Sequence, residues 1–149
     1  SFGDLESPEE LHPETDTERT IVSVMHHRAS SSGGWQTTAA WGRNRNDPGL
    51  TLDAFLLESA LTIGGRHTVL GRFEVAEKDE LFLEDDPLHG LEFEVVHAGL
   101  GYLYEALQGR RWALGTGVYG SVSHVPDEIE PVYGSNPLSG TVFARLKIR

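Results

Sequence analysis

Seven histidines are the first residues of this sequence that suggest metal binding or acid–base chemistry. His26 and His27 are adjacent, so on a strand their side chains point to opposite faces and do not meet at one ion. The others are scattered, and the sequence contains no HExxH or comparable spacing. His97 is the best single candidate, and the simplest expectation for it is a hydrogen-bonded interior histidine.

Carboxylates gather in three acidic stretches, at residues 4–18, 77–86 and 127–130. Their oxygens are the ligands that divalent cations such as Ca²⁺ prefer. A solvated acidic rim is the simpler interpretation, so the sequence predicts no metal and no cofactor. The weak metal candidates are the three carboxylates of the densest cluster, Glu84, Asp85 and Asp86.

Serine, histidine and acid residues also fall on one face of two predicted strands, at His97, Glu105, Ser121 and Ser123. This combination leaves a barrel hydrolase as an alternative, since such side chains can form a nucleophile and its base. No GxSxG elbow is present, and the small residues of GVYGSVS suit a curved strand better. The sequence therefore favours a protein without enzymatic activity.

The element that must position these residues is the stretch from Gly90 to Ser123, which is typical of an antiparallel hairpin. Two runs with period-two alternation flank a polar turn at residues 107–110, and side chains alternate across a strand. One face is small or polar. The other face is apolar, with Val96, Ala98, Leu100, Tyr102 and Tyr104 in the first run and Trp112, Leu114, Thr116, Val118 and Val122 in the second.

The same alternation predicts further strands, and these cover residues 19–28, 35–41, 50–63, 67–77 and 141–149. Short turns lie near residues 31, 65 and 108. The long loops are residues 42–49, 78–89 and 124–140. Because short and long connections alternate, we expect an up-and-down meander with tight turns on one rim and long loops on the other.

Residues 1–18 are predicted to form an acidic N-terminal arm, with a strand remnant at residues 1–3 and a helical turn at residues 9–12. Residues 19–149 then form the meander, and 1–149 is one domain, as the length suggests. A meander favours closure, because closure removes the exposed sheet edges. We therefore predict an all-β fold, an antiparallel up-and-down β-barrel of about eight strands.

Composition excludes several classes of partner and chemistry. The net charge of −11 argues against a nucleic-acid partner, since phosphate binding needs a basic face. No apolar run approaches the length of a membrane helix. The chain has no cysteine, so disulfides and thiolate chemistry are excluded.

Charged residues within the strands decide which way the barrel faces. Burying them in a soluble barrel would require dense ion pairing. The attraction within a buried ion pair often does not offset the free energy lost when the two charges leave water. A membrane barrel instead turns its apolar face outward and its charges into the lumen. We predict a lumen polar network of Glu58, Arg72, Glu74, His97, Glu105 and Arg145, and an outward aromatic girdle of Trp35, Trp41, Tyr102, Tyr104 and Trp112.

Several segments carry a resemblance to a known family. They are SPEELHP, VMHHR, GGWQTTAAWGRN, AFLLESAL, RHTVLGRFEVAEKDELF, LGYLYE and the closing VFARLKIR. In this order they resemble the C-terminal part of a family of large bacterial outer-membrane β-barrel proteins, many of them porin-like. The resemblance implies an outer-membrane barrel with its acidic long loops outside the cell. Such barrels commonly end in an aromatic residue, whereas this chain ends in Ile148-Arg149.

The prediction is therefore an outer-membrane-type β-barrel, or a fragment of a longer one, that serves as a passive pore for transport or as a structural scaffold. Its partners would be membrane lipid or detergent, and a second copy joined through the edge strands. Its location would be the bacterial outer membrane. One alternative is a soluble lipocalin-like barrel, secreted or periplasmic, that binds a small apolar ligand; the other is the barrel hydrolase.

Overall fold

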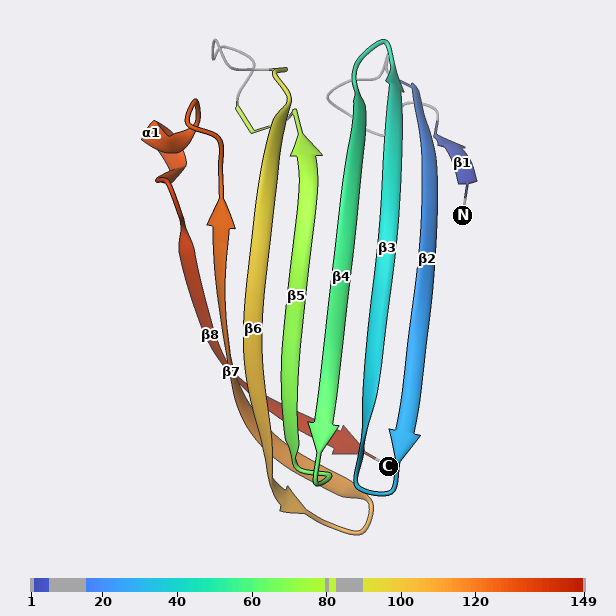
Figure 1. Ribbon diagram of the computed structural model, residues 1–149, viewed down its shortest axis with the longest axis vertical. Coiled ribbons are helices and arrows are strands. Elements are labelled where there is room, and N and C mark those ends of the chain that lie inside the picture. The colour runs from blue at the N-terminus through green and yellow to red at the C-terminus, as the bar shows by residue number, and fades with distance from the viewer. Residues whose placement is uncertain (1, 6–15, 80, 83–89, 149) are drawn as a thin grey trace.

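The computed structural model describes residues 2–5, 16–79, 81–82 and 90–148. Its strands are joined in one sheet in the order of the sequence, each antiparallel to the next (Figure 1). The predicted all-β, up-and-down arrangement is therefore confirmed. The elements are β1 (Phe2–Leu5), β2 (Asp16–Ser30), β3 (Gly33–Asp47), β4 (Thr51–Ile63), β5 (His67–Lys78), β6 (Phe93–Gln108), β7 (Trp112–His124), α1 (Glu130–Tyr133) and β8 (Leu138–Ile148).

Several strands extend further than the apolar pattern predicts. The predicted loop at residues 42–49 is mostly wrong, because β3 stays paired with β2 as far as Asp47. Polar side chains continue across this pair, where Thr17 donates to Asn46 over 2.8 Å and Arg19 donates to Asn44 over 2.8 Å. The backbone ladder needs no apolar side chains, so alternation alone ended the strands too early.

Two other strands, β2 and β8, also begin earlier than predicted. β2 begins at Asp16, within the predicted acidic arm, and β8 begins at Leu138, within the predicted loop 124–140. That loop also contains the single turn of α1, which starts with a proline near its N-terminus. The helical turn predicted at residues 9–12 lies outside the described residues.

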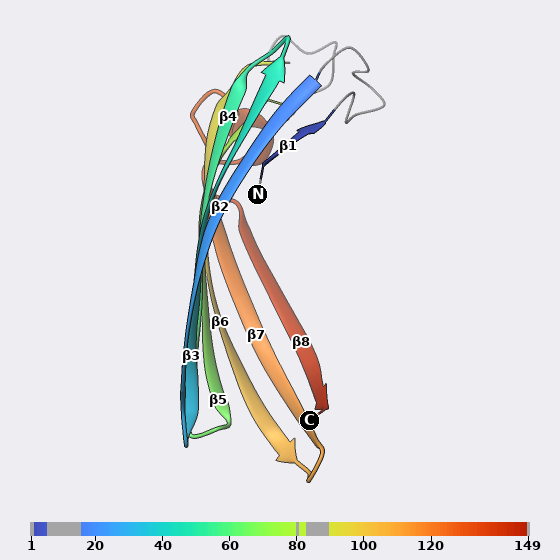
Figure 2. The same cartoon turned by 90° about the vertical axis from the view of Figure 1, so that its right-hand side faces the viewer.

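The sheet is strongly curved and open. In Figure 2, β1 and β8 both bend to the same side of the sheet formed by β2 to β6. β1 pairs with residues 17–20 of β2, and in the described sheet it is separated from β8 by all the other strands. The predicted closure into a barrel is therefore not seen.

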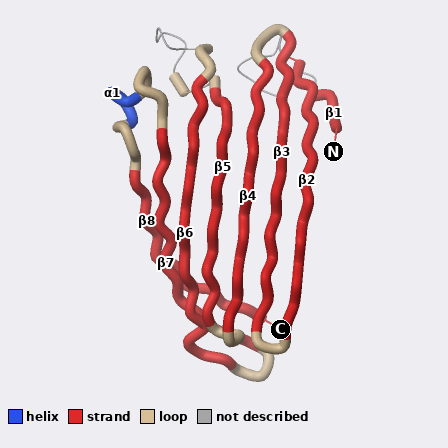
Figure 3. Tube along the Cα trace, viewed as in Figure 1, coloured by secondary structure: helices blue, strands red, loops and turns tan. Residues whose placement is uncertain are grey.

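The two ends of the sheet differ, as Figure 3 shows. Three tight turns, at residues 31–32, 64–66 and 109–111, lie at one end, which we call the short-turn rim. The link at residues 48–50 and α1 lie at the other end, the loop rim. The link at residues 48–50 is short rather than long, because β3 takes up most of the predicted loop and β4 begins at Thr51.

Burial alternates along the strands and distinguishes two faces. On the inner side of the curve, the concave face, Leu103 and Ala113 are each only 1% exposed. On the opposite side, the outer face, the neighbouring Trp112 and Leu114 are 44% and 39% exposed. The curvature covers the concave face and leaves the outer face open.

A small hydrophobic core closes part of the loop rim. Phe93, Val125 and Ile129 are buried together, with Phe82 and Val95 packed against them. The ring of Phe82 meets that of Phe93 edge-on, with centroids 5.9 Å apart. The chain between β7 and β8 therefore folds back onto the sheet.

Candidate functional site

The concave face encloses an open hollow of about 1000 Å³. The lining residues come from the adjacent strands β2 to β7. Most residues of this lining are polar or charged. They include Gln36, Glu58, Arg72, Glu74, His97 and Ser123.

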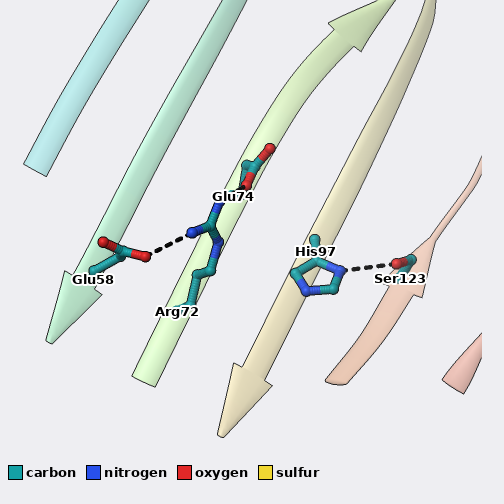
Figure 4. Close-up of polar contacts among 5 residues, drawn as sticks. All are labelled: Glu58, Arg72, Glu74, His97 and Ser123. Atoms are coloured by element: carbon teal, nitrogen blue, oxygen red, sulfur yellow. Dashed lines mark hydrogen bonds and ion pairs between the residues drawn. The ribbon is translucent and has the colours of Figure 1, made fainter. Parts of the chain in front are cut away.

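Arg72 joins two carboxylates on neighbouring positions of the hollow. Its guanidinium donates to Glu58 on β4 over 2.6 Å and to Glu74 on its own strand over 2.6 Å (Figure 4). Register places Glu58 directly opposite Arg72, and the strand period of two returns Glu74 to the same face. The side chains are between 30% and 45% exposed, so water screens these pairs in the open sheet.

His97 meets a serine across the next strand pair. Its Nδ1 lies 3.0 Å from Ser123 Oγ, and β6 and β7 hold the two residues opposite each other (Figure 4). Glu74 is opposite His97 on the other side, but the carboxylate of Glu74 accepts from Arg72. A serine–histidine contact therefore forms, whereas the nearest acid belongs to the arginine cluster.

Glu105 and Arg145 form a second polar cluster near the short-turn rim. Arg145 donates to Glu105 over 2.7 Å, and Gln108 donates to the other oxygen of Glu105 over 3.1 Å. The Glu105 side chain is only 6% exposed. The predicted network is thus divided: Arg145 belongs with Glu105, and Arg72 belongs with Glu58 and Glu74.

Glycines on β6 form a floor on which aromatic rings lie, and this feature was missed in the sequence. A side chain at Gly99 or Gly101 would collide with Tyr119 of β7, whose ring crosses both positions. A side chain at Gly117 would likewise collide with the ring of Phe143 on β8. Glycine directly or diagonally opposite an aromatic residue was the available signal, because only a missing side chain lets the ring lie flat.

The outer face is apolar and exposed across the middle of the sheet. Register aligns its side chains in rows, for example Ala39, Leu57, Phe73 and Ala98. Between the two rims its described positions on β4 to β8 include no Asp, Glu, Lys or Arg. Exposure there reaches 40% for Phe73, 67% for Leu100 and 79% for Val142.

The five predicted girdle aromatics all fall on the outer face but are unevenly placed. Trp35, Tyr102, Tyr104 and Trp112 lie toward the short-turn rim, and Trp41 lies toward the loop rim. Polar groups accompany them: Trp35 donates to Ser59 over 2.9 Å, and His67 Nδ1 lies 2.6 Å from the Tyr102 hydroxyl.

Beyond Trp41 the outer face becomes charged. Arg43 binds Asp53 with two hydrogen bonds of 2.9 Å and 2.7 Å, and its guanidinium lies 5.3 Å from the centre of the Trp41 ring. Glu77 accepts from the backbone N–H of Asp53 over 2.6 Å. The apolar surface therefore ends at a polar belt on the side of the loop rim.

Within the described part of the chain, no group of three or more His, Asp or Glu side chains is placed to hold a metal ion. The weak candidates Glu84, Asp85 and Asp86 lie outside the described residues. Nor does any helix in the described ranges have the length and apolarity to cross a membrane.

Comparisons with known proteins give no relative. No family model matches the sequence, and neither a curated protein nor a solved structure matches it.

Proposed function

We propose that this chain is a transmembrane antiparallel β-barrel of the outer-membrane type, or part of a larger one, that acts as a passive pore or scaffold. The closed state would join the edges of the curved sheet and turn the hollow into the lumen. Membrane lipid would then cover the outer face.

One observation carries this proposal: the polarity of the sheet is the reverse of that in a soluble barrel. Apolar side chains lie on the exposed outer face, and the charges of Glu58, Arg72 and Glu105 lie on the concave face. Soluble proteins rarely leave contiguous apolar surface of this kind uncovered. Membrane barrels alternate apolar residues toward lipid with polar residues toward the lumen.

The height of the apolar surface also suits a bilayer. The outward-facing side chains of this surface carry no charge over residues 55–63 in β4, 67–75 in β5 and 112–122 in β7. A transmembrane β-strand needs about 9–11 residues when it is tilted. Aromatic residues stand at both ends of this band, at Trp41 and at Trp112, as they do at membrane interfaces.

The alternatives have less support. A lipocalin-like barrel would line its interior with apolar side chains for its ligand, but the hollow has charged residues in its lining. A hydrolase would use the contact between His97 and Ser123, but Glu74 is held by Arg72. Neither alternative accounts for the apolar outer face.

Leu56 and Leu57 provide a matched test because they are identical neighbours on opposite faces. Leu57 lies on the outer face between Ala39 and Phe73, and Leu56 lies on the concave face between Ala40 and Glu74. In a membrane barrel, Leu57→Arg should cost about 2–4 kcal/mol. Leu56→Arg should cost much less, because the new cation lies next to Glu74. Urea unfolding in vesicles, followed by tryptophan fluorescence, measures both.

A soluble barrel predicts the opposite order for this pair. Leu57→Arg would then place a charge in water at little cost, while Leu56→Arg would disturb the interior. Protein that stays monodisperse without detergent, together with this opposite order, would exclude the membrane proposal. The interior of a closed eight-stranded barrel is filled by side chains, so such a barrel should not conduct ions. Conductance across a planar bilayer therefore separates a pore from a scaffold.

A further inference from the structure

Basic residues concentrate on the short-turn rim. Because the ends of β2, β4, β6 and β8 meet at this edge, residues far apart in the sequence lie on one rim (Figure 1). Those described there are Arg28, Arg66, Arg110, Arg111, Arg145 and Lys147. The only described acid at this end is Glu105, which already pairs with Arg145.

Hydrogen bonds between the tight turns hold this rim together. The N–H of Gly65 donates to Ser32 over 2.7 Å, and the side chain of Gln108 donates to the carbonyl of Gly65 over 2.9 Å. The N–H of Glu105 donates to the carbonyl of Arg66 over 2.8 Å. The turns are therefore one connected edge, and Arg66, Arg110 and Arg111 are exposed on it.

The opposite rim has the reverse charge. Its described acidic residues include Asp47, Glu92, Glu94, Asp127 and Glu128. These outnumber the basic residues nearby, which are Arg19, Arg43, Arg45 and Lys78. Among the described residues, acids therefore outnumber cations at the loop rim, whereas cations outnumber acids at the short-turn rim.

Aromatic residues lie between the apolar band and the turn arginines Arg66, Arg110 and Arg111. Trp35, Tyr104 and Trp112 lie on the outer face next to the short turns. Aromatic rings of this kind sit at the headgroup level of a bilayer, with charges just beyond them. The exposed arginines therefore stand at the height of lipid phosphates.

We propose that the short-turn rim binds the phosphates of anionic phospholipids through Arg66, Arg110 and Arg111, with Arg28 beside them. The proposal rests on the membrane barrel proposed above and adds the lipid class and the end of the molecule that contacts it. A juxtamembrane Lys or Arg attracts an anionic surface, and guanidinium groups suit phosphate because their parallel N–H donors match two of its oxygens. The acidic loop rim is repelled by the same surface.

The test compares vesicles of phosphatidylcholine alone with vesicles that also contain phosphatidylglycerol. Binding and insertion of the full chain are followed by tryptophan fluorescence and by protection from protease. The variant R110Q/R111Q removes two cations from the basic rim. The matched control R45Q/K78Q removes two exposed cations from the loop rim, so both variants have the same net charge.

We expect native protein and R45Q/K78Q to bind phosphatidylglycerol vesicles more tightly than neutral ones, and added salt to remove this preference. R110Q/R111Q should lose roughly thirtyfold in that preference. Insertion into phosphatidylcholine with no preference for phosphatidylglycerol would overturn the lipid inference alone. An equal loss in both variants would do the same, because it would show a general effect of charge. Failure to insert into either vesicle would instead overturn the membrane barrel itself.

Discussion

At the scale of single residues, the two ion clusters of the concave face differ in how much they depend on their arginine. Glu105 is almost fully buried and has Arg145 as its cationic partner, whereas Glu58 and Glu74 share Arg72 in a more open place. A buried carboxylate that loses its partner keeps its full desolvation penalty, and an exposed one recovers water.

We therefore expect Arg145→Leu to destabilise the protein by about 2–3 kcal/mol and, as long as the sheet is open, Arg72→Leu by less than about 1 kcal/mol. Urea unfolding in detergent measures both. Adding Glu105→Gln to Arg145→Leu should recover stability, because it removes the charge left without a partner. An Arg72→Leu variant that loses as much as Arg145→Leu would mean that the cluster of Arg72 is buried, as in a closed lumen.

Glycine at position 99 provides a second prediction at this scale. A Cβ at Gly99 would collide with the hydroxyl end of Tyr119, whereas a Cβ at Gly71 meets nothing within 4 Å. Gly99→Ala should cost about 1–3 kcal/mol, since the ring must leave its place on the strand. Gly71→Ala should be neutral or slightly stabilising, because alanine has fewer unfolded conformations. Equal effects on the unfolding midpoint would show that Tyr119 does not rest on the glycine floor.

At the scale of elements, the segment between β7 and β8 is attached to the sheet by few contacts. Ile129 is 1% exposed in the small core with Phe93 and Val125, whereas Val132 on α1 is 65% exposed. The hydroxyl of Tyr133 also donates to the carbonyl of Leu81 over 2.9 Å. This core lies at the end of the strand ladder, where β6 begins with Phe93, so its loss should be local.

We expect Ile129→Ala to lose about 2–5 kcal/mol of local stability and Val132→Ala to lose almost none. Limited proteolysis should then cut Ile129→Ala within residues 125–137 sooner than it cuts the native chain. The unfolding midpoint of the sheet should stay where it is. Cleavage at the same rate in both variants would show that the segment does not depend on this core.

At the scale of the whole molecule, the two edges of the described sheet are open, and an open edge presents backbone N–H and C=O groups without a partner strand. β8 has its free edge along Leu138–Ile148, and β1 covers only residues 17–20 of β2. An exposed edge with Val142 and Leu146 on its apolar side is a template for another strand. If the sheet does not close on itself, we expect two copies to pair edge to edge through β8.

The absence of cysteine makes this pairing measurable. Single-cysteine variants at Val142, Ala144 and Leu146 should form disulfide-linked dimers in one register only, because antiparallel pairing brings one position opposite itself. Light scattering in detergent should give the mass of a dimer. A monomer whose β8 amides exchange rapidly with solvent would show an edge that is neither closed nor paired.

Period-two alternation in the sequence determined the strands and their faces. Side chains on a strand point alternately to two sides, so the charges of Glu58, Arg72 and Glu74 had to share a face opposite Leu57 and Phe73. Short turns between strands then made neighbours in sequence neighbours in the sheet. The all-β meander follows from these local rules.

Only the tertiary structure decided what depends on register and curvature. Arg145 meets Glu105 because β7 lies between β6 and β8 and aligns Gly115 with both residues, and a glycine there lets the two long side chains reach each other. The polar ends of β2 and β3 stay paired because backbone hydrogen bonds do not depend on side-chain type. The gap between β1 and β8 arises from the summed bend of all the strands, a quantity that no single stretch of sequence contains.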